Sequence, residues 1–293
     1  MTDTAGMADQ FEQNRGRLRA VAYRMLGSST EADDAVQEAW LRLSRSNAAE
    51  IENLGRWLTT VTARVCLDML RARQSRREDS IDAEPVAPPT SSKGTLDPER
   101  EAVLADSVGL ALLVILDRLA PAERLAFVLH DMFGMSFEEI AGIVGRTATA
   151  TRQLASRARR RVQGAPASSG VDLRGQREVV DAFLGALRAG DVDGLVAVLD
   201  PDVVVHIDQA AGGPGAAREI HGAREWARGA VAFAAMSGSV RPVLVNGSVG
   251  LVMAPHGHLM RAVAFTFAGG KIVEADIIAD PIRLRTLDIA LAT

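Results

Sequence analysis

The chain has 293 residues, 47% of them hydrophobic, and a formal net charge of −4. This length exceeds a single typical core, so we expect two or three domains. The one cysteine, Cys66, excludes an internal disulfide and a cysteine-based metal cluster, which fits a reducing compartment. The longest apolar run, 108–116, is too short to cross a bilayer, and the N-terminus lacks a signal-peptide pattern. We therefore predict a cytoplasmic protein that does not contact membranes.

Charge is distributed unevenly along the chain. The net charge is +2 in residues 1–77, −5 in 78–105, +2 in 106–163 and −3 in 171–293. Segment 78–105 is rich in acids, proline, serine and threonine and is typical of a flexible acidic linker, while 164–170 consists mainly of small residues and proline. These breaks predict three modules. Because the whole chain is acidic, nucleic-acid binding must depend on short cationic faces or on a larger complex.

The first module is predicted to be all-helical, with helices near 8–26, 30–45 and 54–73. Opposite its core face, the second helix gathers four side chains at helical spacing: Asp34, Gln37, Glu38 and Leu41. An exposed leucine beside three acceptors indicates a partner surface, and an ordinary solvated face explains it equally well. The third helix ends in cations that complement its dipole and places Cys66 in an apolar pattern, which predicts a buried thiol.

The middle module contains a predicted helix-turn-helix. Ser136 followed by Glu139 is a capping-box arrangement at the start of the first helix, and Gly145 supplies the turn. The next stretch, 147–162, has five arginines and no acid. Helical spacing puts five polar side chains on its outer face: Arg152, Gln153, Ser156, Arg157 and Arg160. Arginine and glutamine can pair with guanine and adenine edges, so this face is predicted to read duplex DNA; an arginine-rich solvated helix is the alternative.

The C-terminal module changes from helical to strand periodicity. An amphipathic helix over 179–191 and a second short helix precede five predicted strands, near 203–207, 240–245, 249–253, 259–267 and 271–278. Asn246-Gly247 and Gly269-Gly270 predict hairpin turns. Helices followed by a curved antiparallel sheet predict an α+β cone.

Three motifs, at 23–28, 31–42 and 57–71, resemble region 2 of the extracytoplasmic-function group of bacterial RNA polymerase sigma factors. Residues 106–162 are similar to region 4 of the same family, in which Leu119-Ala120-Pro121-Ala122-Glu123-Arg124 leads into the helix-turn-helix. The resemblance implies a multidomain fold with two all-α sigma domains, a region 2 helical bundle and a region 4 helix-turn-helix. It also implies a non-enzymatic subunit that binds core RNA polymerase and directs it to particular promoters.

The resemblance assigns roles to individual positions. The face made by Asp34, Gln37, Glu38 and Leu41 matches the surface that docks on the polymerase clamp. The start of the third helix matches the part that captures the melted minus-ten strand, with Asn53, Arg56, Trp57 and Arg64 as candidates; Trp57 is equally compatible with a core position. The outer face of the helix-turn-helix would read the minus-thirty-five duplex, and the acidic linker would run along the polymerase, mimicking nucleic acid.

Two further stretches, 189–191 and 199–203, resemble the SnoaL-like, nuclear-transport-factor-2-like fold, which one branch of these sigma factors carries C-terminally. The resemblance implies that 171–293 regulates the sigma domains through intramolecular contact. Two motifs of that branch match only in part, at 208–213 and 279–284. Because the same fold hosts cyclases and isomerases, a DNA-binding regulator with a C-terminal sensor or enzyme stays open as an alternative.

Several residues of this module are candidates for a pocket or a regulatory surface. Six of them could line the cone, where a His/Asp pair could perform acid–base chemistry: His206, Asp208, His221, Trp226, His258 and Asp276. Asp280 and Pro281 belong to the second motif, and ordinary hydrogen-bonded structural groups are the alternative for all of them. The sequence shows no nucleophile motif, phosphate loop or metal-ligand spacing, so no catalytic residue, metal or cofactor is expected, whereas a small-molecule ligand stays open.

Overall fold

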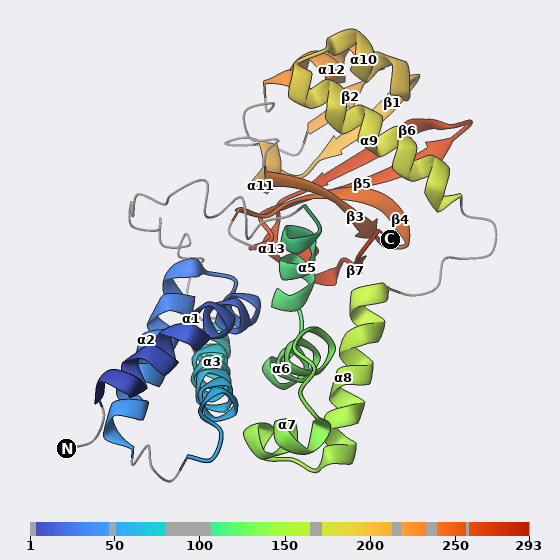
Figure 1. Ribbon diagram of the computed structural model, residues 1–293. Coiled ribbons are helices and arrows are strands. Elements are labelled where there is room, and N and C mark those ends of the chain that lie inside the picture. Colours follow the sequence, from blue (N-terminus) through green and yellow to red (C-terminus); the bar gives the residue numbers. More distant parts are fainter. Residues whose placement is uncertain are drawn as a thin grey trace. The chain divides into compact units, whose positions relative to one another are not determined.

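The computed structural model describes residues 4–46, 51–79, 107–164, 172–212, 218–232, 239–255 and 258–292. Contacts divide the chain into two compact units (Figure 1). The first comprises Met1–Ala105 and Leu116–Arg159, and the second comprises Asp106–Ile115 and Arg160–Thr293. Most of the two predicted linkers, 78–105 and 164–170, lies outside the described residues.

The first unit opens with a three-helix bundle: α1 (Thr4–Leu26), α2 (Ser29–Arg45) and α3 (Leu54–Asp79). Ser28 accepts a hydrogen bond from the Glu31 N–H at the start of α2, and Asn53 accepts one from the Arg56 N–H at the start of α3. Each of these two helices therefore begins at a residue that satisfies a free backbone donor. The three predicted helices are confirmed, and their buried core is mostly aliphatic, including Leu18, Met25, Val36, Leu43, Leu58 and Leu67.

The rest of the first unit contains α6 (Pro121–Phe127), the π-helical turn η3 (Val128–Met132), α7 (Phe137–Val144) and most of α8 (Ala148–Gln163), whose residues from Arg160 on belong to the second unit. The Ser136 hydroxyl accepts from the Glu139 N–H at 3.3 Å, and the Glu139 carboxylate accepts from the Ser136 N–H at 2.8 Å, so the capping box is confirmed. Gly145 has a φ of 73°, a left-handed conformation that glycine adopts without strain. The predicted inner face of α8 is buried, with Thr151, Ala155, Ala158 and Val162.

The longest apolar run of the sequence forms α5 (Ser107–Asp117), whose residues up to Ile115 belong to the second unit. Leu113 and Ile115 are each 1% exposed, as expected for a helix that is apolar on all sides and lies in a core. Within the described part of the chain, no helix has the length and apolar character needed to span a membrane.

The second unit holds a seven-stranded sheet with the order β2-β1-β6-β5-β4-β3-β7. The strands are β1 (Leu199–Ile207), β2 (Arg218–His221), β3 (Val240–Val245), β4 (Ser248–Met253), β5 (Arg261–Ala268), β6 (Lys271–Ile278) and β7 (Ile289–Ala290). Its helices are α9 (Leu173–Ala189), α10 (Val192–Val198), α11 (Gln209–Gly212), α12 (Ala223–Val231) and α13 (Pro281–Thr286). This confirms the α+β class of the module.

Turn chemistry and strand pairing agree with the sequence in most places. Asn246 and Gly247 join β3 to β4 with φ values of 52° and 85°, and Gly269 and Gly270 join β5 to β6 with positive φ, as tight hairpins require. The prediction of a fully antiparallel sheet is wrong for one pair, because β6 returns beside β1 in the same direction. The short strands β2 and β7 were not predicted, since so few residues show no alternation.

Helices α9, α10 and α12 cover one face of the sheet (Figure 1). Phe183 on α9, Trp226 on α12 and Phe265 on β5 form a cluster with ring centroids 5.4, 5.7 and 6.4 Å apart. Each of the three side chains is no more than 5% exposed. Aromatic and aliphatic side chains therefore fill the space between helices and sheet, where a ligand-binding cone would have its cavity.

Candidate nucleic-acid interface

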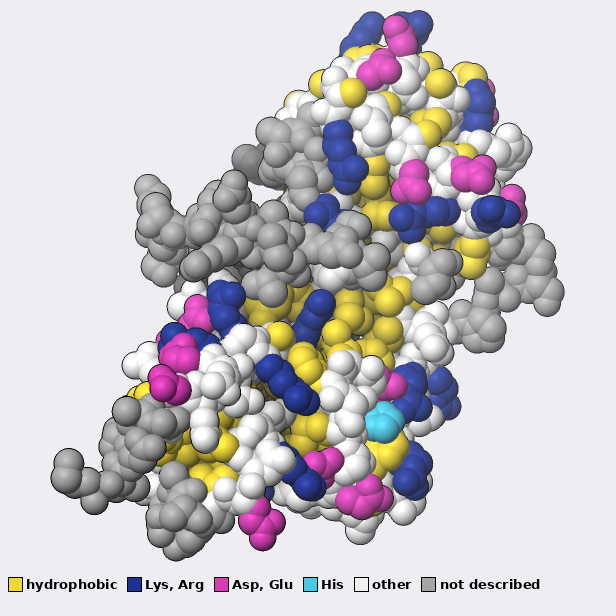
Figure 2. Space-filling view, viewed as in Figure 1, with side chains coloured by type: hydrophobic (Ala, Val, Ile, Leu, Met, Phe, Trp, Pro, Cys, Tyr) yellow, Lys and Arg dark blue, Asp and Glu magenta, His cyan; other side chains and the backbone are white. Residues whose placement is uncertain are grey.

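The outer face of α8 is polar, cationic and open to solvent. Figure 2 shows Lys and Arg side chains grouped over α8 at the lower right, with acidic side chains beside them. The structure exposes all five residues predicted for the minus-thirty-five element: Arg152, Gln153, Ser156, Arg157 and Arg160. Because the opposite side of α8 is buried, these side chains form one continuous surface.

Two arginines of this face have contacts that sequence reasoning missed. The Arg157 Nε donates to Glu123 Oε1 at 2.9 Å, and the Glu123 side chain is 7% exposed, so Arg157 also neutralises a nearly buried carboxylate. The Arg152 guanidinium lies 5.1 Å from the centre of the Phe137 ring on α7, a cation–π contact. Part of the face is therefore already oriented by the protein itself.

The residues predicted for the minus-ten strand lie along the first half of α3. Asn53 is its cap, because Asn53 Oδ1 accepts from the Arg56 N–H at 2.9 Å. Trp57 is partly buried, whereas Arg56 and Arg64 are exposed. Asn53 thus has a clear structural role, and the two arginines are the accessible members of the group.

Both of these arginines contact α7. Arg56 Nε forms an ion pair with Glu139 Oε1, and Arg64 Nη2 donates to the Gly142 carbonyl at 3.3 Å. Hydrogen bonds from the Ser136 side chain and backbone, followed by the charge of Arg56, hold the pKa of Glu139 below its ordinary value. The carboxylate is therefore charged at neutral pH. Groups on the first helix of the helix-turn-helix thus already contact the two arginines of α3.

The predicted docking face of α2 is open. Asp34 and Gln37 are exposed, and Leu41 is 38% exposed. Glu38 Oε1 accepts from Arg42 Nε at 2.8 Å, one turn along the same helix. Among the described residues, no hydrogen bond or ion pair joins Asp34 or Gln37 to another side chain.

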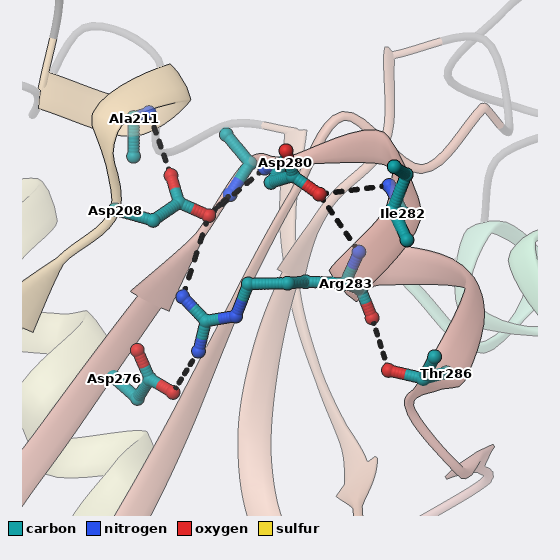
Figure 3. A network of polar contacts seen from close by, with 8 residues as sticks. Asp208, Ala211, Asp276, Asp280, Ile282, Arg283 and Thr286 are labelled. Carbon is teal, nitrogen blue, oxygen red and sulfur yellow. Dashed lines mark hydrogen bonds and ion pairs between the residues drawn. The ribbon is translucent and has the colours of Figure 1, made fainter.

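In the C-terminal module, Asp208 joins the two partly matched motifs (Figure 3). Its carboxylate accepts from the N–H groups of Ala211 at 2.8 Å and of Ala279 and Asp280 at 2.9 Å. Burial acts to raise the pKa of Asp208, but these N–H donors and the charge of Arg283 outweigh it and lower the pKa. An ionised Asp208 therefore ties the end of β1 to the start of α13.

The second motif forms the cap of α13. Asp280 Oδ1 accepts from the N–H groups of Ile282 and Arg283 at 2.9 Å, and Pro281 occupies the first helical position. Arg283 Nη2 lies 2.6 Å from Asp276 Oδ2, and its Nη1 lies 3.6 Å from Asp208 Oδ2 (Figure 3). The signal for this cap, Asp followed by Pro, was present in the sequence.

The six residues expected to line the cone do not share one cavity, which corrects the prediction. Trp226 lies in the core, and His258 and His221 do not line the recess that borders His206. That recess, of about 370 Å³, is lined by His206, Ile207, Asp208, Gln209, Arg218, Glu219, Asp276 and Arg283. His206 and Asp276 pair across β1 and β6 and point away from the core, because side chains alternate along a strand and Val205 and Ala275 are buried. Among the described residues, no group of three or more His, Cys, Asp and Glu side chains is suited to hold a metal ion.

Two family models match the chain, Sigma-70 region 2 over residues 10–76 and Sigma-70 region 4 over residues 109–162. The chain is 35% identical over 280 residues to a probable ECF RNA polymerase sigma factor, SigI of Mycobacterium tuberculosis, covering 94% of both chains. It is 36% identical over 290 residues to the ECF RNA polymerase sigma factor SigJ of the same species, covering 93% of this chain and 91% of the relative. The crystal structure of SigJ aligns with 94% of this chain and 98% of its own, at 34% identity and a TM-score of 0.47.

Proposed function

The chain belongs to the extracytoplasmic-function family of RNA polymerase sigma factors, and from that premise we propose that three helices share its contacts with polymerase and promoter. Helix α2 docks on core polymerase, α3 holds the melted minus-ten strand, and α8 reads the minus-thirty-five duplex. The observation that carries this assignment is the outer face of α8, where five exposed polar side chains stand on a helix-turn-helix with a packed inner face.

The docking face of α2 supports a protein partner rather than a nucleic acid. Its exposed Leu41 supplies an apolar contact, and Asp34, Gln37 and Glu38 surround it with acceptors. An apolar centre with a polar rim is the usual anatomy of a protein interface, and the acidic side chains would repel DNA. The clamp of core RNA polymerase is the proposed partner.

The start of α3 supports contact with a single strand. Arg56 and Arg64 can hold a phosphate backbone, and the partly buried Trp57 offers an aromatic surface for an unstacked base. Asn53 contributes by fixing where α3 begins, because its side-chain oxygen is already used in the cap.

On α8, Arg152 and Gln153 are proposed to contact base edges, and Arg157 and Arg160 to contact phosphates. The N-terminal half of a recognition helix enters the major groove, and both Arg152 and Gln153 stand in that half. Ser156 lies between the two groups and can donate to either kind of acceptor.

The C-terminal module is proposed to regulate the sigma domains by intramolecular contact rather than to catalyse a reaction. Its interior is filled by Phe183, Trp226 and Phe265, which argues against an enclosed active site. The junction of Asp208 with Asp280 is the proposed regulatory surface. The recess beside His206 favours a second candidate function, the sensing of a small polar ligand. The protein would act with polymerase in the cytoplasm.

Run-off transcription with core RNA polymerase and the full chain tests the proposed function. Fragments of its own host's genome serve as templates, and we expect initiation at sites that core polymerase alone does not use. Arg152→Ala should lower promoter-specific initiation with core binding unchanged. Arg228→Ala, which removes an exposed arginine of α12, is the matched control and should leave initiation intact. No promoter-specific initiation by the full chain would contradict the function, and equal loss of core binding would contradict the role of Arg152.

A further inference from the structure

The three arginines that the first unit holds on α8 differ in their partners. Arg157 Nε donates to Glu123 Oε1 at 2.9 Å. Arg159 Nε donates to Asp131 Oδ1 at 2.6 Å. Arg152, in contrast, has no hydrogen bond or ion pair among the described residues. The charges of the first two are therefore partly offset by carboxylates, whereas all N–H donors of the Arg152 guanidinium are available to a bound molecule.

The contact that Arg152 does make is with an aromatic ring. Its Cζ lies 5.1 Å from the centre of the Phe137 ring, within the range of a cation–π interaction. This interaction depends on the positive charge of the guanidinium over the ring, whereas a guanine edge is bound by the N–H groups of the guanidinium. The ring can thus restrict the side chain without competing for the groups that would read a base.

Phe137 is itself held in place by the turn that precedes it. It is the first residue of α7, directly after the Ser136 cap. Its ring stacks on that of His130, with centroids 3.8 Å apart and planes inclined by 27°. His130 Nδ1 lies 2.9 Å from the Met135 carbonyl oxygen, and because a carbonyl only accepts, Nδ1 is the donor. A hydrogen bond therefore fixes the ring against which Phe137 packs.

Burial alone does not explain an aromatic residue at this position. The apolar side chains with which α7 joins the core, Ile140, Ile143 and Val144, are each no more than 8% exposed. Phe137 and His130 are both only partly buried. The two stacked rings therefore stand at the surface, beside the arginine that they support, rather than in the core of the helix-turn-helix.

We propose that Phe137, stacked on His130, is a positioning residue that orients Arg152 and thereby sets the preference of the protein at one base pair of the minus-thirty-five element. An unrestrained arginine can turn toward whichever acceptor a base pair or phosphate offers. A restrained one keeps its donors at one place, so a base pair without acceptors there leaves them unpaired at a cost. This inference rests on the proposed function, because it takes α8 as the reader of the duplex.

The first test measures base preference with the complete holoenzyme. Core RNA polymerase with the full chain selects from a pool of duplexes that carry a randomised segment, and the bound duplexes are sequenced. Arg152→Ala should lower the preference at one base pair about tenfold, which identifies the position that Arg152 reads. Phe137→Leu should lower the preference at that same base pair about threefold, the size expected for a lost cation–π contact, with other positions unchanged.

Three further variants separate positioning from packing. Phe137→Tyr keeps an aromatic ring and should retain the preference of the wild type. Phe133→Leu makes the same change at a partly buried ring that has no aromatic or cation–π contact among the described residues, so it should change no preference. Phe137→Leu combined with Arg152→Ala should lose no more than Arg152→Ala alone, because the ring acts only through this arginine.

A spectroscopic measurement reports the contact directly, without relying on DNA. NMR of the full chain, with arginine labelled by ¹⁵N, detects the Arg152 side-chain N–H, which is identified by its absence in Arg152→Ala. We expect a ring-current shift of this signal in the wild type and in Phe137→Tyr and its loss in Phe137→Leu. His130→Gln keeps a donor for the Met135 carbonyl but removes the stacked ring, and it should reduce the shift. Thermal unfolding confirms that each variant is folded.

Two failures are distinguishable. Equal base preferences of the wild type and a folded Phe137→Leu variant would overturn this inference while the proposed function stands, and so would a loss spread evenly over all base pairs, which a purely structural role predicts. Selection of no sequence by the wild-type holoenzyme would overturn the proposed function, and the inference with it.

Discussion

Two faces of the same three-helix bundle differ in how far the protein itself occupies them. On α2, Asp34 and Gln37 have no partner among the described residues, and Leu41 is exposed. On α3, Arg56 and Arg64 both contact α7. The surface proposed for polymerase is therefore open, whereas the arginines proposed for the melted strand are exposed but already in contact with α7.

This difference predicts the order in which polymerase and the DNA strand bind. Among the described residues of the first unit, a partner that binds α2 meets no competitor, whereas a DNA strand competes with α7 for the arginines of α3. We therefore expect polymerase to bind first and the strand second. The acidic charge of the chain favours the same order, since it weakens contact with free DNA.

The largest expected effect tests the open face. Glu38→Arg inverts one charge of the docking surface and should lower the affinity for core RNA polymerase about a hundredfold, because a like charge at an interface costs several kcal/mol. Fluorescence anisotropy with labelled full chain measures this affinity. Asp68→Arg makes the same inversion at an exposed site of α3 and should bind nearly as the wild type does. Equal affinity of the wild type, Glu38→Arg and Asp68→Arg for core polymerase would contradict the assignment of the α2 face as the docking surface.

The next effect concerns the Asp208–Asp280 junction of the C-terminal module, which lies outside the three-helix bundle. Asp208→Asn weakens three charge-assisted backbone hydrogen bonds and should lower the free energy of unfolding by about 2 kcal/mol. Thermal unfolding measures it, with the exposed Asp202→Asn as control. If this module regulates the sigma domains, Asp208→Asn should also change promoter-specific initiation in the run-off assay. Unchanged initiation would limit the comparison to the first unit alone.

The pH dependence of that effect follows from the lowered pKa of Asp208. A carboxyl whose pKa is lower in the folded state contributes stability above its unfolded pKa, about 3.9, and loses it as the pH falls through the folded value. The stability gap between wild type and Asp208→Asn should therefore be constant above about pH 5 and close below about pH 3. A gap that widens on acidification would contradict the assignment.

A smaller effect compares the outer face of α8 with the arginines of α3, which contact α7. Gln153→Ala should relax preference at one base position by about tenfold, because a bidentate amide–adenine contact is lost. Arg160→Ala should instead weaken binding to all duplexes and lower the salt slope by about one. Neither effect should depend on whether Glu139→Gln is also present, since Glu139 pairs with Arg56 on α3. Strong coupling to Glu139→Gln would break the comparison.

The smallest effect concerns the cap that holds Glu139. Ser136→Ala should cost α7 about 1 kcal/mol and return the pKa of Glu139 toward its ordinary value. The ion pair of ionised Glu139 with Arg56 is lost as the pH falls through that pKa, so it should break at a higher pH in the variant, as an NMR titration of the Glu139 carboxyl measures. Ser28→Ala removes the corresponding cap of α2 and should leave the titration of Glu139 unchanged.

Local signals in the sequence predicted much of the fold. The Ser136 cap, the left-handed Gly145 and the Asn246-Gly247 turn each depend on a few neighbouring residues, so their patterns could be read directly. The five-residue outer face of α8 followed from helical spacing alone. The parallel pairing of β1 with β6 could not be predicted from the sequence, because it depends on how segments far apart in the chain come together in the sheet.

The contacts of α7 with α3 and the burial of Arg124 could not be predicted for the same reason. Nothing near Arg56 indicates Glu139, and Arg124 stands in a stretch whose charges suggest an exposed helix rather than a buried side chain. The two halves of the Asp208–Asp280 junction were each noticed, but their hydrogen bonds appear only once β6 lies beside β1. Trp226 was expected at a cavity and instead fills it, because Phe183 and Phe265 pack against it.

The buried thiol of Cys66 has a consequence for the kinds of signal that can act on this protein. Burial raises its pKa to about 12, so almost none of it exists as thiolate at neutral pH. Thiolate is the form that attacks peroxides and disulfides, and the sequence holds no second cysteine to form a bridge. An oxidative signal is therefore not expected to act on these helices through Cys66, because so little of this thiol is in its reactive form.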